Sequence, residues 1–329
     1  MIGDFPAIVV LCGGVGAARL LAGLVQVVDP ASITAIVNTA DDLVMHGLSI
    51  SPDLDTIVYT LADATDPVRG WGLRDESWHA MEALERFEAK RPAGSSAGTT
   101  WFRLGDRDLA THMYRTQRLA EGASLTTVTA ELVTAWGLGL RLLPVTDDPI
   151  RTLVTIAGSD TESQHDVSFQ DYFVRLRHDV AVTAVRFAGA DSARPNEAAL
   201  EAIRGADTLI IAPSNPIVSI GPLLAVPGIE AALRERHREV IAVSPLIGGR
   251  ALKGPADRMM AELGSTSDNE GVARAYRGIA STLVIDAIDA SDAAAITALG
   301  MQAVVTPTIM STPERAAALA STILEHRPC

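Results

Sequence analysis

The feature that most constrains the fold is the regular alternation of short apolar segments with helical patterns. The first unit has apolar segments at 8–12 and 33–39 around a helical pattern at 17–27. Strands separated by helices are typical of a parallel sheet, because parallel neighbours need a crossover connection. Further strands are predicted in the C-terminal half, at 208–213, 240–244, 282–285 and 302–306. The sequence therefore predicts the α/β class, with a mostly parallel sheet covered by helices on both faces.

The middle of the chain departs from this alternation. Helical patterns follow one another without strands at 77–87, 106–121 and 126–136. The β-rich pieces that come next are expected to form an antiparallel accessory sheet, and they lie at 141–145, 152–157 and 182–187. We predict a single domain over 1–329. It has a Rossmann-like core of about 1–55 and 190–329 and a helical and β-rich insertion of about 56–189.

Two polar segments and the chain's end complete the predicted organisation. Residues 91–100, which read RPAGSSAGTT, are small and polar enough for a mobile loop and form the best candidate for a lid. Residues 158–166 are also expected to be a polar loop. Residues 313–326 are expected to form a final amphipathic helix.

Composition excludes several classes of partner. The chain carries 27 Lys and Arg residues against 40 Asp and Glu residues, a net charge of -13, so no basic surface is expected to bind nucleic acid. The apolar runs are much shorter than the roughly 20 residues that span a membrane. With Asp4 and no basic region at the N-terminus, a cytoplasmic location is predicted. Cys12 and Cys329 form no disulfide framework, and Cys12 is expected to pack in the core.

A glycine turn lies between the first predicted strand and the first predicted helix, at GGVGAAR from Gly13 to Arg19. Backbone N–H groups of Gly13, Gly14 and Gly16 at a helix N-terminus suit a phosphate or diphosphate. A dinucleotide fingerprint needs a small residue where Arg19 stands and an acid where Asn38 stands, which disfavours nicotinamide cofactors. The alternative is a tight turn without a ligand.

Four carboxylates follow the second strand. Asp41 and Asp42 lie in NTADD, directly after Asn38, and Asp53 and Asp55 lie in SPDLDT. Oxygen ligands without sulfur or paired histidines favour Mg²⁺, which proteins hold with one or two carboxylates while substrate phosphates complete its shell. In the alternative interpretation Asp53 caps a helix that begins near Pro52, and the other acids are solvated.

Polar turns also follow the later strands. They include Ser214, Asn215, Ser219, Gly221, Ser244 and Lys253. Because these turns end parallel strands, we expect them at the same sheet edge as the glycine turn, with Lys253 close to a phosphate. Ordinary polar loops are the alternative.

The segment at 101–108 offers aromatic and arginine side chains for a stacking wall, although a capped helix explains it as well. The lone histidines His79 and His112 are more typical of structural groups.

Taken together, the motifs resemble the CofD/FbiA family, the 2-phospholactate or phosphoenolpyruvate transferases of coenzyme F420 biosynthesis. The motifs that carry the resemblance run in family order, and they are GGVGAAR, NTADD, HGLSISPDLDT, RGWGLRDESWHA, LGDRDLATH, APSNPIVSIGP and SPLIGGRALKGPAD. Ala17 replaces a glycine of the family's GGVGGAR, a mild change at a helical position. NTADD in place of NVGDD is similar to archaeal members, which leaves the donor open.

The resemblance implies an enzyme that transfers a substituted phosphate group with the help of Mg²⁺. It would move the enolpyruvyl-phosphate or 2-phospholactyl group from a guanosine diphosphate ester to the deazaflavin Fo, 7,8-didemethyl-8-hydroxy-5-deazariboflavin. The products would be dehydro-F420-0 or F420-0, and GMP. The tryptophan-rich RGWGLRDESWHA segment resembles the actinobacterial branch and so favours the enolpyruvyl donor.

The resemblance also implies roles for individual residues. Asp55 and Asp41 would be catalytic, with Asp55 near the Fo hydroxyl as the candidate general base, and Arg103 would lie in the Fo pocket. Asp41, Asp42 and Asp55 would hold Mg²⁺. The guanylate and phosphate site would be lined by Gly13, Gly14, Gly16, Asn38, Ser214, Asn215, Ser219, Gly221, Ser244 and Lys253.

The alternatives belong to other classes of protein. YvcK-like proteins share the glycine turn but are nucleotide-sugar-binding regulators without transferase activity. They carry a DDGGSSG-like stretch, whereas here Asp41-Asp42 is followed by Leu43-Val44-Met45-His46, which favours the transferase. A nicotinamide oxidoreductase is the third alternative. The expected partners are small-molecule substrates, and the sequence leaves open whether the chain forms a homodimer.

Overall fold

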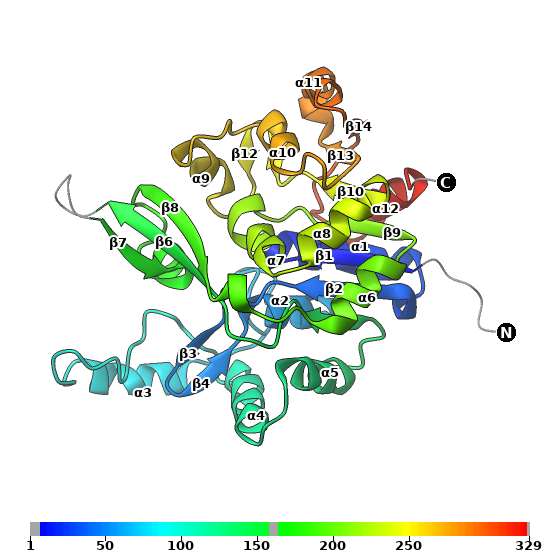
Figure 1. Cartoon of the computed structure of the whole chain (residues 1–329). Coiled ribbons are helices and arrows are strands. Elements are labelled where there is room, and N and C mark those ends of the chain that lie inside the picture. Colours follow the sequence, from blue (N-terminus) through cyan, green and yellow to red (C-terminus); the bar gives the residue numbers. More distant parts are fainter. Residues whose placement is uncertain (1–6, 158–163, 328–329) are drawn as a thin grey trace.

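A computed structural model describes residues 7–157 and 164–327. Its centre is a seven-stranded sheet in the order β14-β13-β10-β9-β1-β2-β5, in which every neighbouring pair is parallel (Figure 1). The strands are β1 (Ile8–Cys12), β2 (Ile33–Val37), β5 (Arg141–Pro144), β9 (Thr208–Ile211), β10 (Val240–Val243), β13 (Thr282–Ile285) and β14 (Gln302–Val305). The predicted α/β class with a parallel sheet is confirmed.

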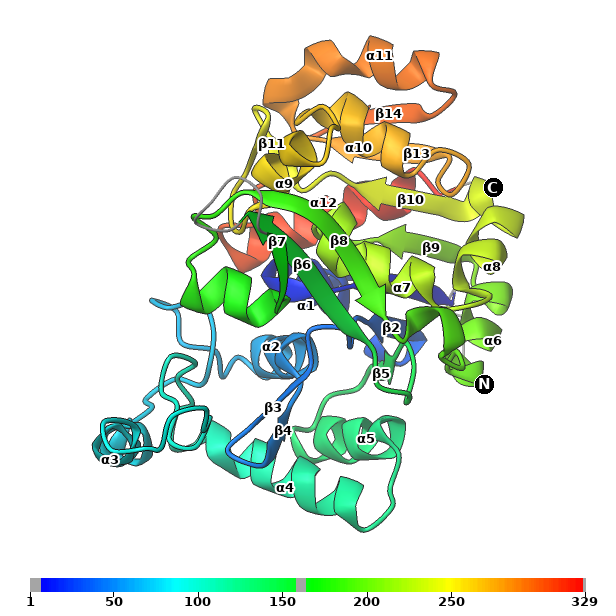
Figure 2. The same cartoon turned by 60° about the vertical axis from the view of Figure 1, so that its left-hand side comes forward.

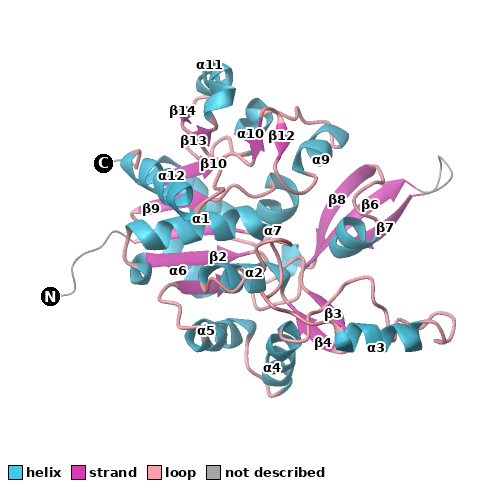
Figure 3. Ribbon diagram, turned by 180° about the vertical axis from the view of Figure 1, so that it is seen from behind, coloured by secondary structure: helices cyan, strands magenta, loops and turns pink. Residues whose placement is uncertain are grey.

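Helices cover both faces of this sheet. Alternate residues of β1 enter two different apolar cores, Val10 and Cys12 one and Val9 and Leu11 the other, as expected for a strand buried on both sides. The first core is closed by α1 (Gly14–Val27), α2 (Pro52–Leu61), α5 (Leu125–Ala135) and α12 (Pro313–Glu325), most of which lie in front of the sheet in Figure 3. The second core is closed by α6 (Glu197–Gly205), α7 (Gly221–Ala225), α8 (Ile229–Glu235), α10 (Asn269–Ala275) and α11 (Ala293–Ala298). Cys12 is buried in the first core, as predicted.

The prediction that residues 141–145 belong to the accessory sheet is wrong. This segment forms β5, which pairs in parallel with β2 from Thr34–Arg141 to Val37–Pro144. The physical reason is that Leu142 and Leu143 both are buried, one in each core, so the strand needs two covered faces. The predicted insertion is therefore divided into a helical part between β2 and β5 and an accessory sheet between β5 and β9.

The accessory sheet is antiparallel and has the order β7-β6-β8. Its strands β6 (Arg151–Ala157) and β8 (Val182–Ala188) confirm two of the three predicted pieces. The third strand is β7 (Gln164–Ser168), part of which falls in the segment predicted as a polar loop; residues 158–163 of that segment lie outside the described residues. Gln164, His165 and Asp166 are exposed, so this strand carries no apolar signal. Figure 2 shows the sheet projecting beside the main one.

The predicted helices of the middle region are present, with ends shifted by a few residues. They are α3 (His79–Glu88), α4 (Asp108–Ala120) and α5. A short hairpin of β3 (Leu43–Met45) and β4 (Leu48–Ile50) was not predicted. Its turn places His46 at φ 54° and Gly47 at φ 76°, the geometry of a two-residue hairpin turn, in which Asn rather than His usually precedes Gly.

Within the described ranges, no single helix is long and apolar enough to cross a membrane. One bent pair, Pro216–Ala225 with Ile229–Glu235, meets the requirement by length and composition only when its two helices are joined.

The close contact of α1 with α12 depends on Gly23. A Cβ atom at Gly23 would lie 2.3 Å from the carbonyl oxygen of Ala316 on α12. We predict that Gly23→Ala lowers the free energy of unfolding by about 1–3 kcal/mol, as overpacking does. Gly205→Ala is the matched control, because a Cβ at Gly205, in α6, meets no atom within 4 Å. Urea unfolding measures both, and equal stabilities would contradict this packing.

Candidate active site

A cavity of about 710 Å³ lies at the carboxyl edge of the main sheet, where the turns after several strands meet. This is the edge at which open α/β sheets bind ligands. The predicted site residues that line it come from both halves of the chain. They are Gly13, Gly14, Gly16, Asp41, Asp55, Arg103, Ser214, Asn215, Ser219, Ser244 and Lys253. Three other predicted residues, Asn38, Asp42 and Gly221, do not line this cavity.

The glycine turn is tightly packed as well as open to the cavity. A Cβ at Gly13 would lie 2.8 Å from Oδ2 of Asp53, and one at Gly16 would lie 2.3 Å from the carbonyl oxygen of Pro213. Gly14 has φ +74°, and a Cβ there would meet no atom within 4 Å. The turn therefore needs glycine at Gly13 and Gly16 for close packing and at Gly14 for its backbone conformation.

Asp53 has a different role from the helix cap of the alternative interpretation. Helix α2 does begin at Pro52, but its N-cap is Ser51. Oδ1 of Asp53 instead accepts a hydrogen bond of 2.9 Å from the backbone N–H of Gly14, at the start of α1. A protein carboxylate thus occupies one of the donors that the sequence analysis assigned to a phosphate.

Asn38 joins two of the acids. Its Nδ2 donates to Oδ2 of Asp41 at 3.1 Å and to Oδ2 of Asp53 at 3.0 Å, and its Oδ1 accepts from the N–H of Ala40. Asn38 is only 1% exposed. Asn38 therefore holds the carboxylates of Asp41 and Asp53 in place from the protein interior and does not line the cavity.

The acids lie in surroundings that disfavour negative charge. Burial raises the pKa of Asp53 to about 6, although hydrogen bonds from Asn38 and Gly14 oppose this shift. Burial and the charge of Asp53 raise the pKa of Asp41 well above its usual value, and burial raises that of Asp42. Oδ1 of Asp41 and Oδ1 of Asp42 are buried without a hydrogen-bond partner in the described structure. These oxygens are suited to a proton or a cation.

The acidic side chains of this site have the oxygen ligands that Mg²⁺ prefers, but they do not form a complete metal centre by themselves. Buried carboxylate oxygens without donors are the hard ligands that this ion prefers. Among residues 7–157 and 164–327, no three acidic, histidine or cysteine side chains are grouped as a complete metal centre. Mg²⁺ usually keeps few protein ligands and fills its shell with water and substrate phosphates, so the acids match that coordination.

Asp55 takes part in a separate ion pair. Arg115, which is 1% exposed, donates from Nη1 to Oδ2 of Asp55 at 3.2 Å and from Nη2 to Oδ1. Both oxygens of Asp55 are thus engaged by a guanidinium group. A carboxylate held in this way would have to give up or share its contacts with the guanidinium group to bind a substrate hydroxyl or a metal ion.

The ion pair extends along α4. Nδ1 of His112 lies 3.3 Å from Nη1 of Arg115, and Nε2 of His112 lies 3.2 Å from Oδ2 of Asp108. The hydroxyl of Tyr59 donates to Oδ1 of Asp108 at 2.5 Å. Sequence reasoning missed Arg115 as a partner of Asp55. The available signal was the spacing of 108, 112 and 115, which places three polar groups on one face of a helix.

Aromatic rings and guanidinium groups form one side of the cavity, and two of them, Phe102 and Arg103, come from the segment 101–108. The rings of Trp71 and Trp78 meet edge to face with centroids 6.2 Å apart. The guanidinium carbon of Arg69 lies 5.0 Å, and that of Arg103 5.1 Å, from the centroid of Trp78. Arg69, Trp71, Phe102 and Arg103 all line the cavity. This surface suits a planar ligand.

Two cations lie at the cavity beside the 69–72 loop. Lys253 and Arg19 both line the cavity, and a Cβ at Gly70 would lie 2.5 Å from Nζ of Lys253. Burial and the charge of Arg19 lower the pKa of Lys253. Sequence reasoning treated Arg19 only as an obstacle to a dinucleotide and did not include it in the site.

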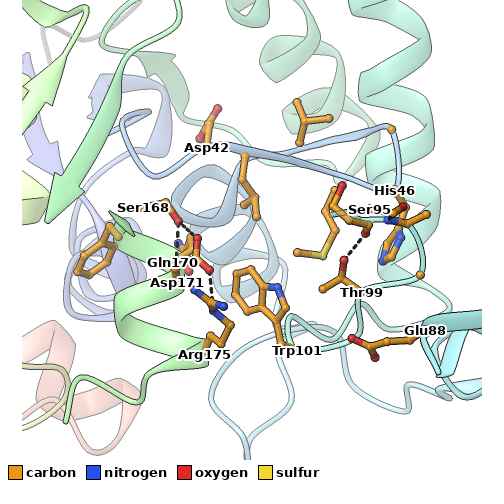
Figure 4. Close-up of a pocket in the computed structure, with 18 of the residues that line it drawn as sticks. Asp42, His46, Glu88, Ser95, Thr99, Trp101, Ser168, Gln170, Asp171 and Arg175 are labelled. Carbon is orange, nitrogen blue, oxygen red and sulfur yellow. Dashed lines mark hydrogen bonds and ion pairs between the residues drawn. The ribbon is translucent and has the colours of Figure 1, made fainter. Parts of the chain in front are cut away.

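A second cavity, of about 1320 Å³, adjoins the first, and Asp41, Phe169 and Gln170 line both. It lies under the β3–β4 hairpin and is partly enclosed by the 91–99 segment; Figure 4 shows Trp101 between the two groups of residues that line it. Asp42 belongs to this cavity, where Oδ2 accepts from Oγ of Ser51 at 2.7 Å.

Gly221, which the sequence assigned to the nucleotide site, does not reach either cavity. Gly221 begins α7, and a Cβ there would lie 2.9 Å from Cζ of Phe187 on the accessory sheet. The glycine is therefore explained by this close packing, and Gly221 lines neither cavity.

Comparisons with known proteins agree with the fold. The model of the family described as 2-phospho-L-lactate transferase CofD matches residues 8–308. A phosphoenolpyruvate transferase of Streptomyces griseus is 42% identical over 319 residues, covering 97% of each chain. One of Mycobacterium avium is 41% identical over 339 residues, covering 97% of this chain and 98% of that one. A solved upf0052-family protein of Bacillus halodurans has a TM-score of 0.62 at 18% identity, covering 98% of this chain and all of that one.

The parallel sheet, with a cavity at the carboxyl edge where sheets of this kind bind ligands, defines an α/β protein with helices on both faces of the sheet. Within that class the chain belongs to the CofD family, and it is a transferase. The family resemblance predicted from the seven motifs is confirmed.

The acidic cluster leads to a pH prediction for the protein without added metal. The pKa of Asp53 is raised in the folded state, so the folded state keeps a proton that the unfolded chain releases from about pH 4. The free energy of unfolding should therefore fall by about 2–3 kcal/mol as the pH rises from about 4 to about 6. Asp53→Asn should flatten this decrease in urea unfolding measured across that range, and an unchanged slope would contradict the shift.

Proposed function

We propose that this transferase acts in coenzyme F420 biosynthesis. It moves the enolpyruvyl-phosphate group from a guanosine diphosphate ester to Fo, giving dehydro-F420-0 and GMP; with a lactyl donor the product is F420-0. The single observation that carries the proposal is that the glycine turn, hydrogen-bonded to Asp53, lies with Asp41 in a cavity that also has an aromatic wall. The relatives named phosphoenolpyruvate transferase favour the enolpyruvyl donor.

The donor is assigned to the glycine turn and the loops of the C-terminal half. The N-terminus of α1 offers N–H groups and its partial positive charge to the diphosphate. Oγ of Ser214 donates to the carbonyl oxygen of Gly13 at 2.7 Å and so fixes that turn. Asn215, Ser219, Ser244 and Lys253 line the same cavity and bind the guanylate and its phosphate.

Asp41 and Asp53 are the residues that would hold Mg²⁺, whereas Asp42 lines the adjoining cavity and is a weaker candidate. When bound, the ion neutralises negative charge on the diphosphate as GMP leaves. Asn38 keeps the two carboxylates together through its hydrogen bonds. Asp55 is a weaker candidate for metal binding and for general base than the sequence suggested, because Arg115 engages both of its oxygens.

The acceptor Fo is assigned to the aromatic side of the cavity. Its planar ring system stacks against the wall that contains Trp71, Phe102 and Arg103. The Fo hydroxyl oxygen forms the new bond to phosphorus and releases its proton to water, and the bond from phosphorus to the GMP oxygen breaks so that GMP leaves with that oxygen. Transfer of this type has a loose transition state, so the protein acts mainly by positioning and electrostatics.

A direct assay tests the proposal. Purified protein is incubated with Fo, Mg²⁺ and either the enolpyruvyl or the lactyl guanosine diphosphate ester, and the products are identified by mass spectrometry. We expect the enolpyruvyl product together with GMP, and no product with EDTA. The lactyl product alone would overturn the donor assignment. Folded protein that gives no product with either donor would contradict the transferase proposal and favour a nucleotide-binding regulator.

The acidic cluster is tested by substitution. Asp41→Asn and Asp53→Asn should each lower kcat by 10²-fold or more, roughly the loss seen when one group that stabilises the transition state is removed. Asp191→Asn is the control, because Asp191 is exposed and lines neither cavity. Circular dichroism verifies folding. Near-normal turnover of both folded variants would remove the cluster from the reaction.

A further inference from the structure

A buried carboxylate anchors a hairpin at the wall of the active-site cavity. The hairpin consists of β11 (Leu246–Ile247) and β12 (Arg250–Ala251). Both oxygens of Asp289 accept hydrogen bonds from the backbone N–H of Gly248 in its turn, at 2.9 and 3.0 Å. Asp289 is 7% exposed and follows β13 in the helical turn Ala287–Asp292. A bond from a charged acceptor to a backbone N–H is stronger than a neutral one, so this contact is a firm attachment point.

The hairpin carries part of the cavity wall. Ile247 lies in its first strand and Lys253 lies two residues after its second, and both line the cavity. Nζ of Lys253 reaches the 69–72 loop beside Gly70. The place of Lys253 therefore depends on where the hairpin is held.

Lys253 lines the same cavity as another cation, Arg19. Burial, and to a smaller extent the charge of Arg19, lower the pKa of Lys253. Neither side chain takes part in a salt bridge among the described residues, although Nη1 of Arg19 donates to the carbonyl oxygen of Met310 at 3.4 Å. Two like charges repel and move apart unless the backbone holds them or an anion lies between them.

The segment that contacts the second cation, Arg19, is attached to an aspartate just before the Ala287–Asp292 turn. Oδ2 of Asp286 accepts from the backbone N–H of Thr308 at 2.7 Å and from its hydroxyl at 3.0 Å. Thr308 and Met310 line the cavity, and Met310 provides the carbonyl oxygen for Arg19. Asp289 and Asp286, which follow β13, thus hold two segments of the cavity wall. The first segment carries Lys253, and the second accepts the hydrogen bond of Arg19.

We propose that Asp289 is a positioning residue for the phosphate of the donor. It clamps the β11–β12 hairpin so that Lys253 stays at the wall of the cavity that Arg19 also lines, and the two cations together bind the phosphate that becomes part of GMP. Asp286 does the same for the segment that supports Arg19. This inference rests on the proposed function, because it takes the anion to be a guanylate phosphate.

The test measures GMP binding by isothermal titration calorimetry and is independent of turnover. Asp289→Ala should weaken GMP binding by about tenfold, the effect of losing one charged contact, and should flatten the dependence of log Kd on log salt concentration. Lys253→Met should give the same loss. The double variant should be no weaker than either single variant, because both remove the same contact. Asp289→Asn retains one acceptor oxygen and should recover part of the affinity.

Asp292→Asn is the matched control and should bind GMP as the wild type does. Asp292 lies in the same turn, but its Oδ2 accepts from Nδ2 of Asn269 at 3.0 Å, and neither residue lines the cavity. Unfolding curves are recorded for every variant, and Asp289→Asn replaces Asp289→Ala if the latter does not fold. Wild-type affinity in the Asp289 variants, or losses that add in the double variant, would overturn the positioning role alone. A wild-type protein that binds no GMP would overturn the proposed function as well.

Discussion

A single buried carboxylate, Asp53, connects the main parts of the site. Through Oδ1 it holds the N-terminus of α1 at Gly14, and through Oδ2 and Asn38 it is joined to Asp41. The glycine turn and the acidic turn after β2 therefore form one unit. Asp53 lies so close to Gly13 that a side chain at that position would collide with its carboxylate. The glycine at this position is therefore explained by the contact with Asp53 as well as by ligand binding.

This unit determines what can bind beside it. A phosphate at the glycine turn would meet the charge of Asp53 and Asp41, and like charges in a buried site raise each other's pKa values. A proton or a divalent cation relieves this repulsion. The proposed Mg²⁺ thus makes the acids and the diphosphate compatible at one edge of the sheet, while Lys253 and Arg19 offset negative charge beside the 69–72 loop.

Much of the fold was predictable from the sequence, because strands buried on both faces and the glycine turn carry strong local signals. β5 was misplaced because a short apolar run does not say which sheet it joins, and part of β7 was taken as a loop because its exposed residues are polar. At the site, the grouping of turns followed from topology. The hydrogen bond of Asp53 to Gly14 and the pairing of Asp55 with Arg115 join residues 39 and 60 positions apart, and no local pattern records such contacts.

If the proposed Mg²⁺ site is correct, the Asp41–Asn38–Asp53 unit exchanges protons for a cation. Calorimetric titration of Mg²⁺ into the protein with GMP at about pH 5.5, in two buffers with different ionisation enthalpies, measures the protons released on binding. With a pKa of about 6 for Asp53, the account predicts release of close to one proton for each bound ion, and a strong reduction in Asp53→Asn. Mg²⁺ binding without proton release, or equal release in Asp53→Asn, would contradict it.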